Sequence, residues 1–281
     1  MLCDLHTHSY YSDGSFSPAE IVAEAKKADL VVALTDHNTV LGLPEFMEAA
    51  AKQGVTAVPG VELSTVYDRH ELHLLGFFIQ PKHYDSIQKR MKEFHALKEL
   101  SNMEMVERLN AAGYKIDYLS VKKRNATGSV NRAHVAAALM EKGYVSSIAE
   151  AFDTLLGEYQ GFYVPPARLK TMDAIRFLRE IHVLPVLAHP LHDLDLQAFR
   201  KMLPEAIAAG LMGIETLHSS YDAATIATAT QIAEEMNLLP SGGSDFHGSN
   251  KPDIRLGVGK GNLHIPNTVY QRLLQAHQSI K

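Results

Sequence analysis

Short apolar runs alternate with helical patterns along most of the chain, and this alternation restricts the folds that the sequence can adopt. Strands separated by helices are typical of repeated β-α units that form a largely parallel sheet. The predicted strands are Leu2–Leu5, Leu30–Leu34, Thr56–Val61, Glu71–Ile79, Val183–Ala188, Gly213–Leu217 and Leu238–Gly242. Seven strands in this order predict an α/β fold, built as an incomplete or distorted barrel.

A stretch without predicted strands interrupts the alternation between about residues 83 and 170. Helical patterns follow one another there, at Ile87–Ala112, Asn131–Lys142 and Ile148–Leu156. Pro165 and Pro166 are predicted to belong to the linker that returns the chain to the barrel. We therefore expect a barrel formed by residues 1–82 and 171–281, and a helical insertion, or cap, formed by residues 83–170.

The first predicted helix has a clear start signal. Ser17 and Glu20 have the spacing of a capping box, and Pro18 occupies the first helical position. The pattern predicts a helix that ends near residues 28–29.

Composition narrows the class of protein. The chain is 46% hydrophobic and 21% charged with a net charge of -5, which is typical of a soluble globular protein and gives no overall basic surface for duplex DNA. The single cysteine, Cys3, cannot form an intrachain disulfide, so a metal site would need nitrogen and oxygen ligands. With no secretory signal and no apolar run of about 18 residues, we expect a cytoplasmic enzyme without a membrane partner or an obligate protein partner.

Histidines and carboxylates gather where the predicted strands end. His6 and His8 lie two residues apart after the first strand, so an extended backbone directs both rings to one side. Glu62 follows the third strand, where a buried carboxylate is costly without a cation. Further candidates are Asp13 in the turn after His8, Asp36 and His37 after the second strand, His73 in the fourth, His189 after the fifth, and Asp245 and His247 after the seventh.

Some of these residues have ordinary explanations when taken singly. Asp13 could be a turn aspartate, and His73 could be a surface histidine. In α/β barrels, however, catalytic residues come from the C-terminal ends of several strands, which is the predicted distribution of the whole set. The set therefore predicts a metal-binding active site.

The same motifs resemble those of the PHP (polymerase and histidinol phosphatase) family of metal-dependent phosphoesterases. The resemblance is carried by His6-Thr7-His8, Thr35-Asp36-His37-Asn38, Gly60-Val61-Glu62, His73, Ala188-His189-Pro190 and Ser244-Asp245-Phe246-His247. It spans nearly the whole barrel and implies a distorted seven-stranded β/α barrel. Within the family, the chain most resembles the bacterial branch that has a helical insertion and an aspartate at the Asp13 position. That branch includes 3',5'-nucleoside bisphosphate phosphatases and a 5'-to-3' exoribonuclease.

The resemblance also implies two to three divalent metal ions. Carried over by motif, the ligand sets are His6, His8, Glu62 and Asp245 for one ion, Asp13, His37 and His247 for a second, and Glu62, His73 and His189 for a third. Imidazole and carboxylate suit zinc, manganese and iron, so all three metals are candidates. We expect Asp36 to orient a neighbouring imidazole as a hydrogen-bond acceptor, with direct metal binding as the alternative.

Such a metal site indicates the type of reaction. Closely spaced ions activate a shared water and bind the phosphoryl group, so hydrolysis needs no protein nucleophile. The sequence contains neither a Gly-x-Ser-x-Gly elbow nor a Walker A loop. We therefore expect metal-bound hydroxide to attack a phosphate ester of a nucleotide or of the 5' end of a short RNA. His218, after the sixth strand, would bind phosphate or protonate the leaving group, or line the pocket without a catalytic role.

Arg132 is the leading candidate for binding phosphate within the insertion. With Asn131 as the predicted N-cap, Arg132 lies in the first helical turn, where a cation opposes the helix dipole and a bound anion would offset the conflict. The insertion-bearing branch of the family has an arginine in a similar motif. The alternative is a solvated surface arginine. His134 and Arg168 are weaker candidates, with ordinary surface positions as the alternative.

Other activities share parts of this pattern. Histidinol phosphate phosphatase shares the metal motifs and is the closest enzymatic alternative. A PHP module retained for binding or structural support, without catalysis, is the alternative from another class. An amidohydrolase acting on C–N bonds would share the barrel and the metals.

Overall fold

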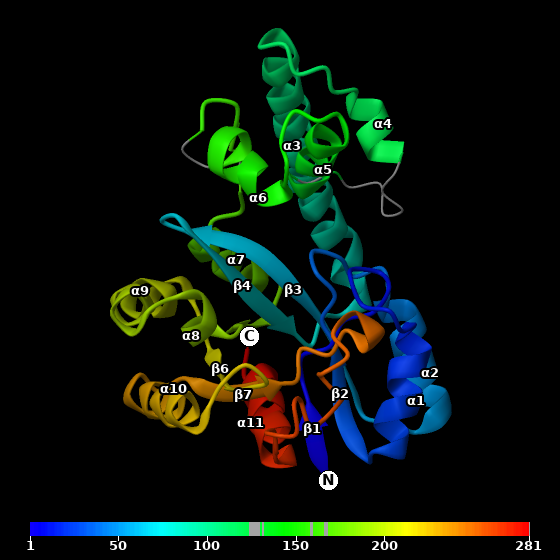
Figure 1. Cartoon of the computed structure of the whole chain (residues 1–281). Helices are drawn as coiled ribbons and strands as arrows, with labels where there is room; N and C mark the ends of the chain where they lie inside the picture. The colour runs from blue at the N-terminus through cyan, green and yellow to red at the C-terminus, as the bar shows by residue number, and fades with distance from the viewer. Residues whose placement is uncertain (124–129, 131, 158–159, 166–167, 281) are drawn as a thin grey trace. The chain divides into compact units, whose positions relative to one another are not determined.

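The computed structural model describes residues 1–123, 130, 132–157, 160–165 and 168–280 (Figure 1). The chain divides into two compact units, which we call the barrel unit (Met1–Met91 and Leu169–Lys281) and the helical unit (Lys92–Arg168). The division falls at Met91 and not at residue 83, inside the long helix α3 (Tyr84–Ala111). The start of α3 belongs to the barrel unit because Ile87 is buried there and the Arg90 guanidinium lies over the Phe177 ring at 5.3 Å.

Seven strands form one sheet in sequence order, which confirms the predicted number of strands and the α/β class. They are β1 (Leu2–Asp4), β2 (Leu30–Leu34), β3 (Ala57–Tyr67), β4 (His70–Phe77), β5 (Leu184–Leu187), β6 (Gly213–His218) and β7 (Leu239–Gly243). The first and last strands also meet: Leu5 N, just after β1, donates to Gly242 O of β7 at 3.1 Å, and beyond the two strands Thr7 and Phe246 form a parallel bridge. The sheet therefore nearly closes into a barrel.

Strand β4 differs from the largely parallel arrangement that the sequence predicts. It runs antiparallel to both β3 and β5, whereas the other neighbouring pairs are parallel. The cause is local: β3 continues six residues beyond the predicted end at Val61, and a tight turn with Asp68 at φ 54° returns the chain directly as β4. No crossover helix separates these two strands.

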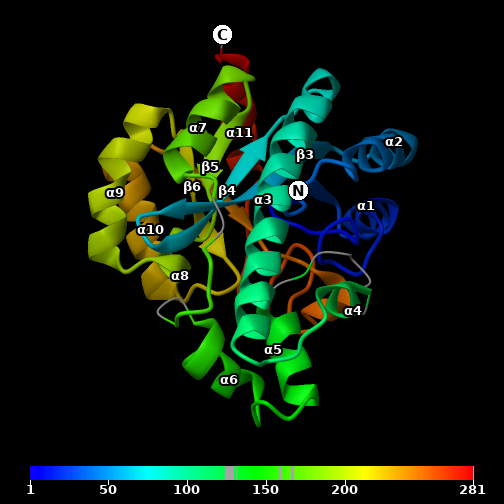
Figure 2. The same cartoon turned by 90° about the horizontal axis from the view of Figure 1, so that it is seen from above.

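Helices surround the nearly closed sheet of the barrel unit. Their bounds are α1 (Pro18–Lys27), α2 (Leu43–Gln53), α7 (Thr171–Glu180), α8 (Pro190–Asp193), α9 (Leu196–Ala209), α10 (Ala223–Glu235) and α11 (Asn267–Gln278), with single 3₁₀ turns at η1 (Pro81–His83) and η3 (Gly248–Asn250). In both views, α1 and α2 lie on one side of the sheet and α9 and α10 on the other (Figures 1 and 2). Apolar side chains from the strands, including Val31, Phe77 and Val186, form the core beneath them.

The capping box predicted for the first helix is confirmed. The Ser17 hydroxyl accepts a hydrogen bond from Glu20 N at 3.1 Å, and the Glu20 carboxylate accepts one from Ser17 N at 2.8 Å. The helix ends at Lys27 with Ala28 as its C-cap, close to the predicted end at residues 28–29. This start fixes the chain four residues after Asp13, one of the predicted metal ligands.

The helical unit contains most of α3, then α4 (Tyr118–Lys123), α5 (Arg132–Glu141), α6 (Ile148–Ala151) and a π-helical turn, η2 (Phe152–Leu156). Its core is separate and includes Leu109, Val135, Leu139 and Leu156. Strands are absent from its described residues, in agreement with the helical pattern in the sequence. Two predictions, the N-cap at Asn131 and the linker at Pro166, fall outside the described residues. None of the described helices has the length and apolarity needed to cross a bilayer.

Candidate metal centre

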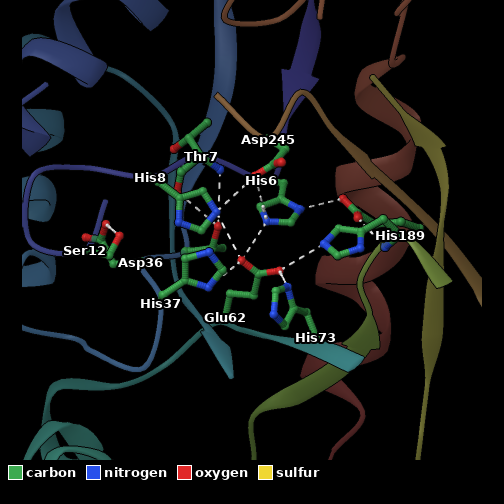
Figure 3. A network of polar contacts seen from close by, with 12 residues as sticks. His6, Thr7, His8, Ser12, Asp36, His37, Glu62, His73, His189 and Asp245 are labelled. Carbon is green, nitrogen blue, oxygen red and sulfur yellow. Dashed lines mark hydrogen bonds and ion pairs between the residues drawn. The ribbon is translucent and has the colours of Figure 1, made fainter. Parts of the chain in front are cut away.

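The predicted ligands converge in the barrel unit, around Glu62 (Figure 3). Glu62 is fully buried, and five histidine rings surround its carboxylate. Its Oε2 lies 3.1 Å from His6 Nε2, His8 Nε2 and His37 Nδ1. Its Oε1 lies 3.0 Å from His73 Nδ1 and 3.3 Å from His189 Nε2.

Two further carboxylates extend the cluster. Asp245 Oδ1 lies 3.3 Å from His8 Nε2 and 3.6 Å from His6 Nε2. Asp13 Oδ1 lies 3.1 Å from His247 Nε2, and Asp13 is within 3.8 Å of both His8 and His37. All nine predicted ligands therefore belong to one connected network.

Many polar atoms in this network are buried without a hydrogen-bond partner. They are His6 Nε2, both ring nitrogens of His8, His37 Nδ1, Glu62 Oε2, His73 Nδ1, His218 Nε2 and His247 Nε2. Leaving one buried polar group unsatisfied costs about 1–3 kcal/mol, so such a concentration requires a compensating partner. Divalent cations fit, because every one of these atoms can be a metal ligand and the donors are all nitrogen or oxygen.

The ligand atoms group in a way that overlaps with the sets implied by the motifs. Five groups of close ligand atoms are His8, Asp13, His37 and His247; His6, His8 and Asp245; His37, Glu62 and His73; His6, Glu62 and His189; and His6, Glu215 and His218. Asp13, His37 and His247 stay together, with His8 added. Glu62 belongs to two of the groups, as its central position requires, whereas His73 and His189 fall in different groups.

The prediction that Glu62 follows the end of the third strand is wrong, whereas His73 lies inside the fourth strand, as predicted. Glu62 is the sixth residue of the eleven-residue β3, and His73 lies within β4. Because β3 and β4 form a long antiparallel pair, with Ser64 opposite His73, they carry both side chains to the end of the barrel from inside strands. His6, His8, His37, His189, Asp245 and His247 do follow their strands directly.

Backbone conformation sets two of the ligands apart. His189 and Asp245 have backbone φ values of 25° and 60°, a region that residues other than glycine rarely adopt. Strain of this kind persists where the surroundings impose it, typically at functional sites. In both residues it occurs at the turn that directs the side chain towards the centre.

Proton affinity in the cluster is divided between two kinds of histidine. Burial alone would lower the pKa of both His73 and His189. At His73 the Glu62 carboxylate outweighs burial and raises the pKa to about 10. At His189 the hydrogen bond to Asp193, together with Glu62, raises the pKa to about 9. At His37, burial prevails and lowers the pKa to about 3. Burial would raise the pKa of Glu62, yet the surrounding rings hold it well below its ordinary value. The metal-free centre thus keeps its carboxylates ionised and holds protons on some rings.

Asp36 does not orient an imidazole, contrary to the prediction. Its carboxylate accepts hydrogen bonds from Ser9 N at 2.7 Å, Ser9 Oγ at 2.6 Å and Ser12 Oγ at 2.7 Å. Asp36 is buried beneath the turn after His8, which contains both serines. Asp36 therefore fixes the segment that carries Asp13, and its influence on the centre is indirect.

The sequence analysis missed three residues that hold the ligands. Glu215 Oε1 lies 3.1 Å from His6 Nδ1, and its Oε2 accepts a 2.8 Å bond from His189 N. Asp193 Oδ2 lies 3.0 Å from His189 Nδ1, and Lys251 Nζ lies 2.6 Å from Asp245 Oδ2. Glu215 could have been found, because it is a carboxylate inside an apolar strand, as Glu62 is. Asp193 is the last residue of the short helix α8 and Lys251 follows the η3 turn, and neither lies in an apolar segment that would single it out.

His218 faces the same centre. Its Nδ1 lies 2.8 Å from Ser220 Oγ and accepts a 3.3 Å bond from Ser220 N, so we assign the proton to Nε2. That Nε2 is buried and lies 3.9 Å from Asp245 Oδ2. Burial lowers the pKa of His218 to about 4, so the ring is neutral at pH 7.

The three predicted phosphate-binding residues lie in the helical unit. The Arg132 guanidinium lies 4.3 Å from the centroid of the Tyr163 ring and 5.5 Å from that of Phe152, and Nη1 donates to Leu156 O at 3.3 Å. Arg168 Nη2 donates to Tyr163 Oη at 3.3 Å, and His134 lies half-buried in α5. Arg132 is thus packed within its own unit and is not a solvated surface arginine.

Comparison with known proteins gives a consistent result. The profile of the PHP domain matches residues 4–164. A 5'-3' exoribonuclease of Haemophilus influenzae is 32% identical over 246 residues, which cover 87% of this chain and 89% of the relative. A 3',5'-nucleoside bisphosphate phosphatase of Chromobacterium violaceum is 29% identical, with 87% and 86% covered. A phosphoribosyl 1,2-cyclic phosphate 1,2-diphosphodiesterase of Eggerthella lenta is 30% identical, with 88% and 95% covered.

The fold is also shared with solved structures. A protein from Bifidobacterium adolescentis, assigned as a metal-dependent phosphoesterase, aligns with a TM-score of 0.70 and 27% identity. The alignment covers 97% of this chain and 95% of that protein. The likeness therefore includes the helical unit as well as the barrel unit.

Proposed function

The chain belongs to the PHP family of phosphoesterases and is a hydrolase, and from this premise we propose that it cleaves a phosphate ester of a nucleotide. The proposed substrates are a 3',5'-nucleoside bisphosphate or the 5' end of a short RNA. The observation that carries the proposal is the cluster of nine histidine and carboxylate ligands centred on the buried Glu62. The names of the relatives from H. influenzae and C. violaceum support the nucleotide.

Metal use follows from the same cluster. We propose two to three divalent ions, of manganese, zinc or iron, because the ligands are too many and too widely arranged for a single ion. When bound, such ions lower the pKa of a coordinated water and neutralise charge on the phosphoryl group. Glu62, whose two oxygens face different histidines, would be among the residues that hold these ions.

The remaining residues position these ligands. Glu215 and Asp193 fix the rings of His6 and His189 through their Nδ1 atoms, which leaves each Nε2 directed at the centre. Asp36 fixes the turn that presents Asp13. Lys251 engages one oxygen of Asp245 and leaves the other for the centre.

His218 is assigned to phosphate binding and not to leaving-group protonation. A neutral ring whose pKa is lowered to about 4 is a poor proton donor at pH 7. Its Nε2–H can still donate a hydrogen bond to a phosphate oxygen beside Asp245. Arg132 is proposed to bind a part of the substrate away from the reacting phosphorus, with His134 and Arg168 as further candidates.

The test is a comparison of kcat/KM under one metal condition for five substrates. They are adenosine 3',5'-bisphosphate, AMP, a 5'-phosphorylated trinucleotide, phosphoribosyl 1,2-cyclic phosphate and histidinol phosphate. We expect the bisphosphate or the trinucleotide to have the highest value. A lead for histidinol phosphate would replace the proposal with the phosphatase alternative, and a lead for the cyclic phosphate would favour the activity named for the E. lenta relative.

Arg132 has its own test within this proposal. Arg132→Ala is expected to lower kcat/KM on nucleotides by roughly tenfold to a hundredfold, and less on a small aryl phosphate, since one charge-assisted hydrogen bond contributes about 1.5–3 kcal/mol. Circular dichroism controls for its packing against Tyr163. Equal losses on both substrates would place Arg132 at the reacting phosphate, and no loss would remove it from the site.

A further inference from the structure

A cavity of about 350 Å³ opens beside the metal centre, and all of its lining residues belong to the barrel unit. Part of the lining consists of predicted ligands, including His37, Glu62 and Asp245. The rest includes residues to which the proposed chemistry gives no role: His192, Ser219, Ser220, Ile254 and Lys260. A cavity of this size is at the lower end of the range for small-molecule sites.

Lys260 is held at this cavity by its backbone. Its amide donates to Asn262 Oδ1 at 3.1 Å, and Asn262 Nδ2 donates to Ser219 O at 3.2 Å and Tyr221 O at 3.3 Å. Gly259, at φ 57°, packs so closely that a Cβ there would lie 3.0 Å from Ser219 Cβ. The loop that carries Lys260 is thus fastened to the turn after β6.

The charges around the cavity leave Lys260 available. Asp193 is paired with His189, and Asp245 is paired with Lys251 at 2.6 Å. The Lys260 ammonium, by contrast, is exposed and has no ion pair among the residues that the structure describes. Lys260 thus carries a positive charge on a loop whose backbone is held in place beside the proposed metal centre. Its ammonium group can bind a second anionic group of a substrate.

We propose that Lys260 binds a second anionic group of the substrate, separate from the phosphate at the metal centre. The ligand class is a nucleotide that carries two distinct phosphate groups, with Ile254 offering an apolar contact to the part between them. The inference rests on the proposed function and deepens it. It places recognition of the second group inside the barrel unit, on Lys260, and not on Arg132.

The experiment measures kcat/KM for adenosine 3',5'-bisphosphate and for AMP in the wild type, Lys260→Ala and Lys260→Arg. Lys260→Ala is expected to lower the value for the bisphosphate by roughly tenfold or more and the value for AMP by no more than about twofold. Lys260→Arg keeps the charge and is expected to restore most of the bisphosphate value. Lys201→Ala, an exposed lysine of α9, is the matched control and should change neither.

Failure of this inference is distinguishable from failure of the proposed function. If the wild type prefers the bisphosphate and Arg132→Ala, not Lys260→Ala, removes that preference, the inference is overturned and the function stands. If the wild type cleaves neither nucleotide, the proposed function fails. Binding of the two nucleotides to the metal-loaded wild type and to metal-loaded Lys260→Ala then decides: a bisphosphate preference that depends on Lys260 supports the site, and any other result overturns it.

Discussion

Two buried carboxylates, Glu62 and Glu215, contact the histidines of this site. Glu62 was predicted from the sequence and Glu215 was not. Both follow the same rule, since a charged residue in an apolar strand needs a partner. The rule predicts Glu62 as a metal ligand. The same rule predicts a partner for Glu215. The structure shows two, the His6 ring and the His189 backbone.

Glu215→Gln tests the positioning of His6. The amide keeps the shape of the side chain but removes the charge that holds His6 Nδ1, so metal affinity is expected to fall by roughly 10- to 100-fold. Competition titration with a chelator measures it, and circular dichroism should change little. Glu234→Gln, on the exposed face of α10, is the matched control. Unchanged affinity in Glu215→Gln would show that His6 needs no such support.

The ligands themselves have a sharper test. His37→Ala and Asp245→Asn are expected to abolish phosphate release, because one removes an imidazole and the other a carboxylate charge, and both groups face the centre and not the core. Far-ultraviolet circular dichroism should match the wild type. Wild-type turnover in either folded variant would mean that the assigned centre is wrong.

At the scale of elements, strand positions were predictable and strand direction was not. Each apolar run became a strand, and the capping box of α1 formed as predicted. The reversal of β4 depends on the turn at residues 68–69, which lacks the Asn-Gly or Asp-Gly signal of a tight hairpin. Without that signal, the sequence predicted β3 and β4 as successive members of a parallel sheet, and Glu62 was placed after the end of the third strand.

Ser17→Ala tests the element that follows the Asp13 turn. Loss of the N-cap of α1 is expected to lower the free energy of unfolding by about 1 kcal/mol, as measured by denaturant titration. Metal stoichiometry should not change, because Ser17 contacts none of the ligands directly. A loss of metal together with stability would mean that the cap also holds the Asp13 turn in place.

At the scale of the whole molecule, the family and the barrel were predictable because their motifs are local. The packing of side chains within the helical unit was less predictable. Arg132 was expected to be free for phosphate, whereas its guanidinium stacks on Tyr163, a residue about 30 positions later. Contacts between side chains so distant along the chain leave no periodic pattern in a single sequence.

Metal binding by the intact protein should depend on pH. His73 and His189, with pKa values of about 10 and about 9, are protonated at pH 7 in the metal-free centre, and ions must displace those protons. Apparent affinity should therefore rise between pH 6 and 9, by roughly tenfold per pH unit for each proton released. Calorimetry in buffers of different ionisation enthalpy counts the protons. Binding without proton release at pH 7 would contradict the division of proton affinity described for the cluster.

The central claim is that this protein hydrolyses phosphate esters with a centre of more than one divalent ion. The most direct measurement is phosphate release from adenosine 3',5'-bisphosphate by chelator-treated protein, titrated with manganese, zinc or iron. We predict negligible activity without metal and a rise that levels off only above one equivalent per chain. Full activity after chelation, or a plateau at one equivalent or less with all three metals, would contradict the claim.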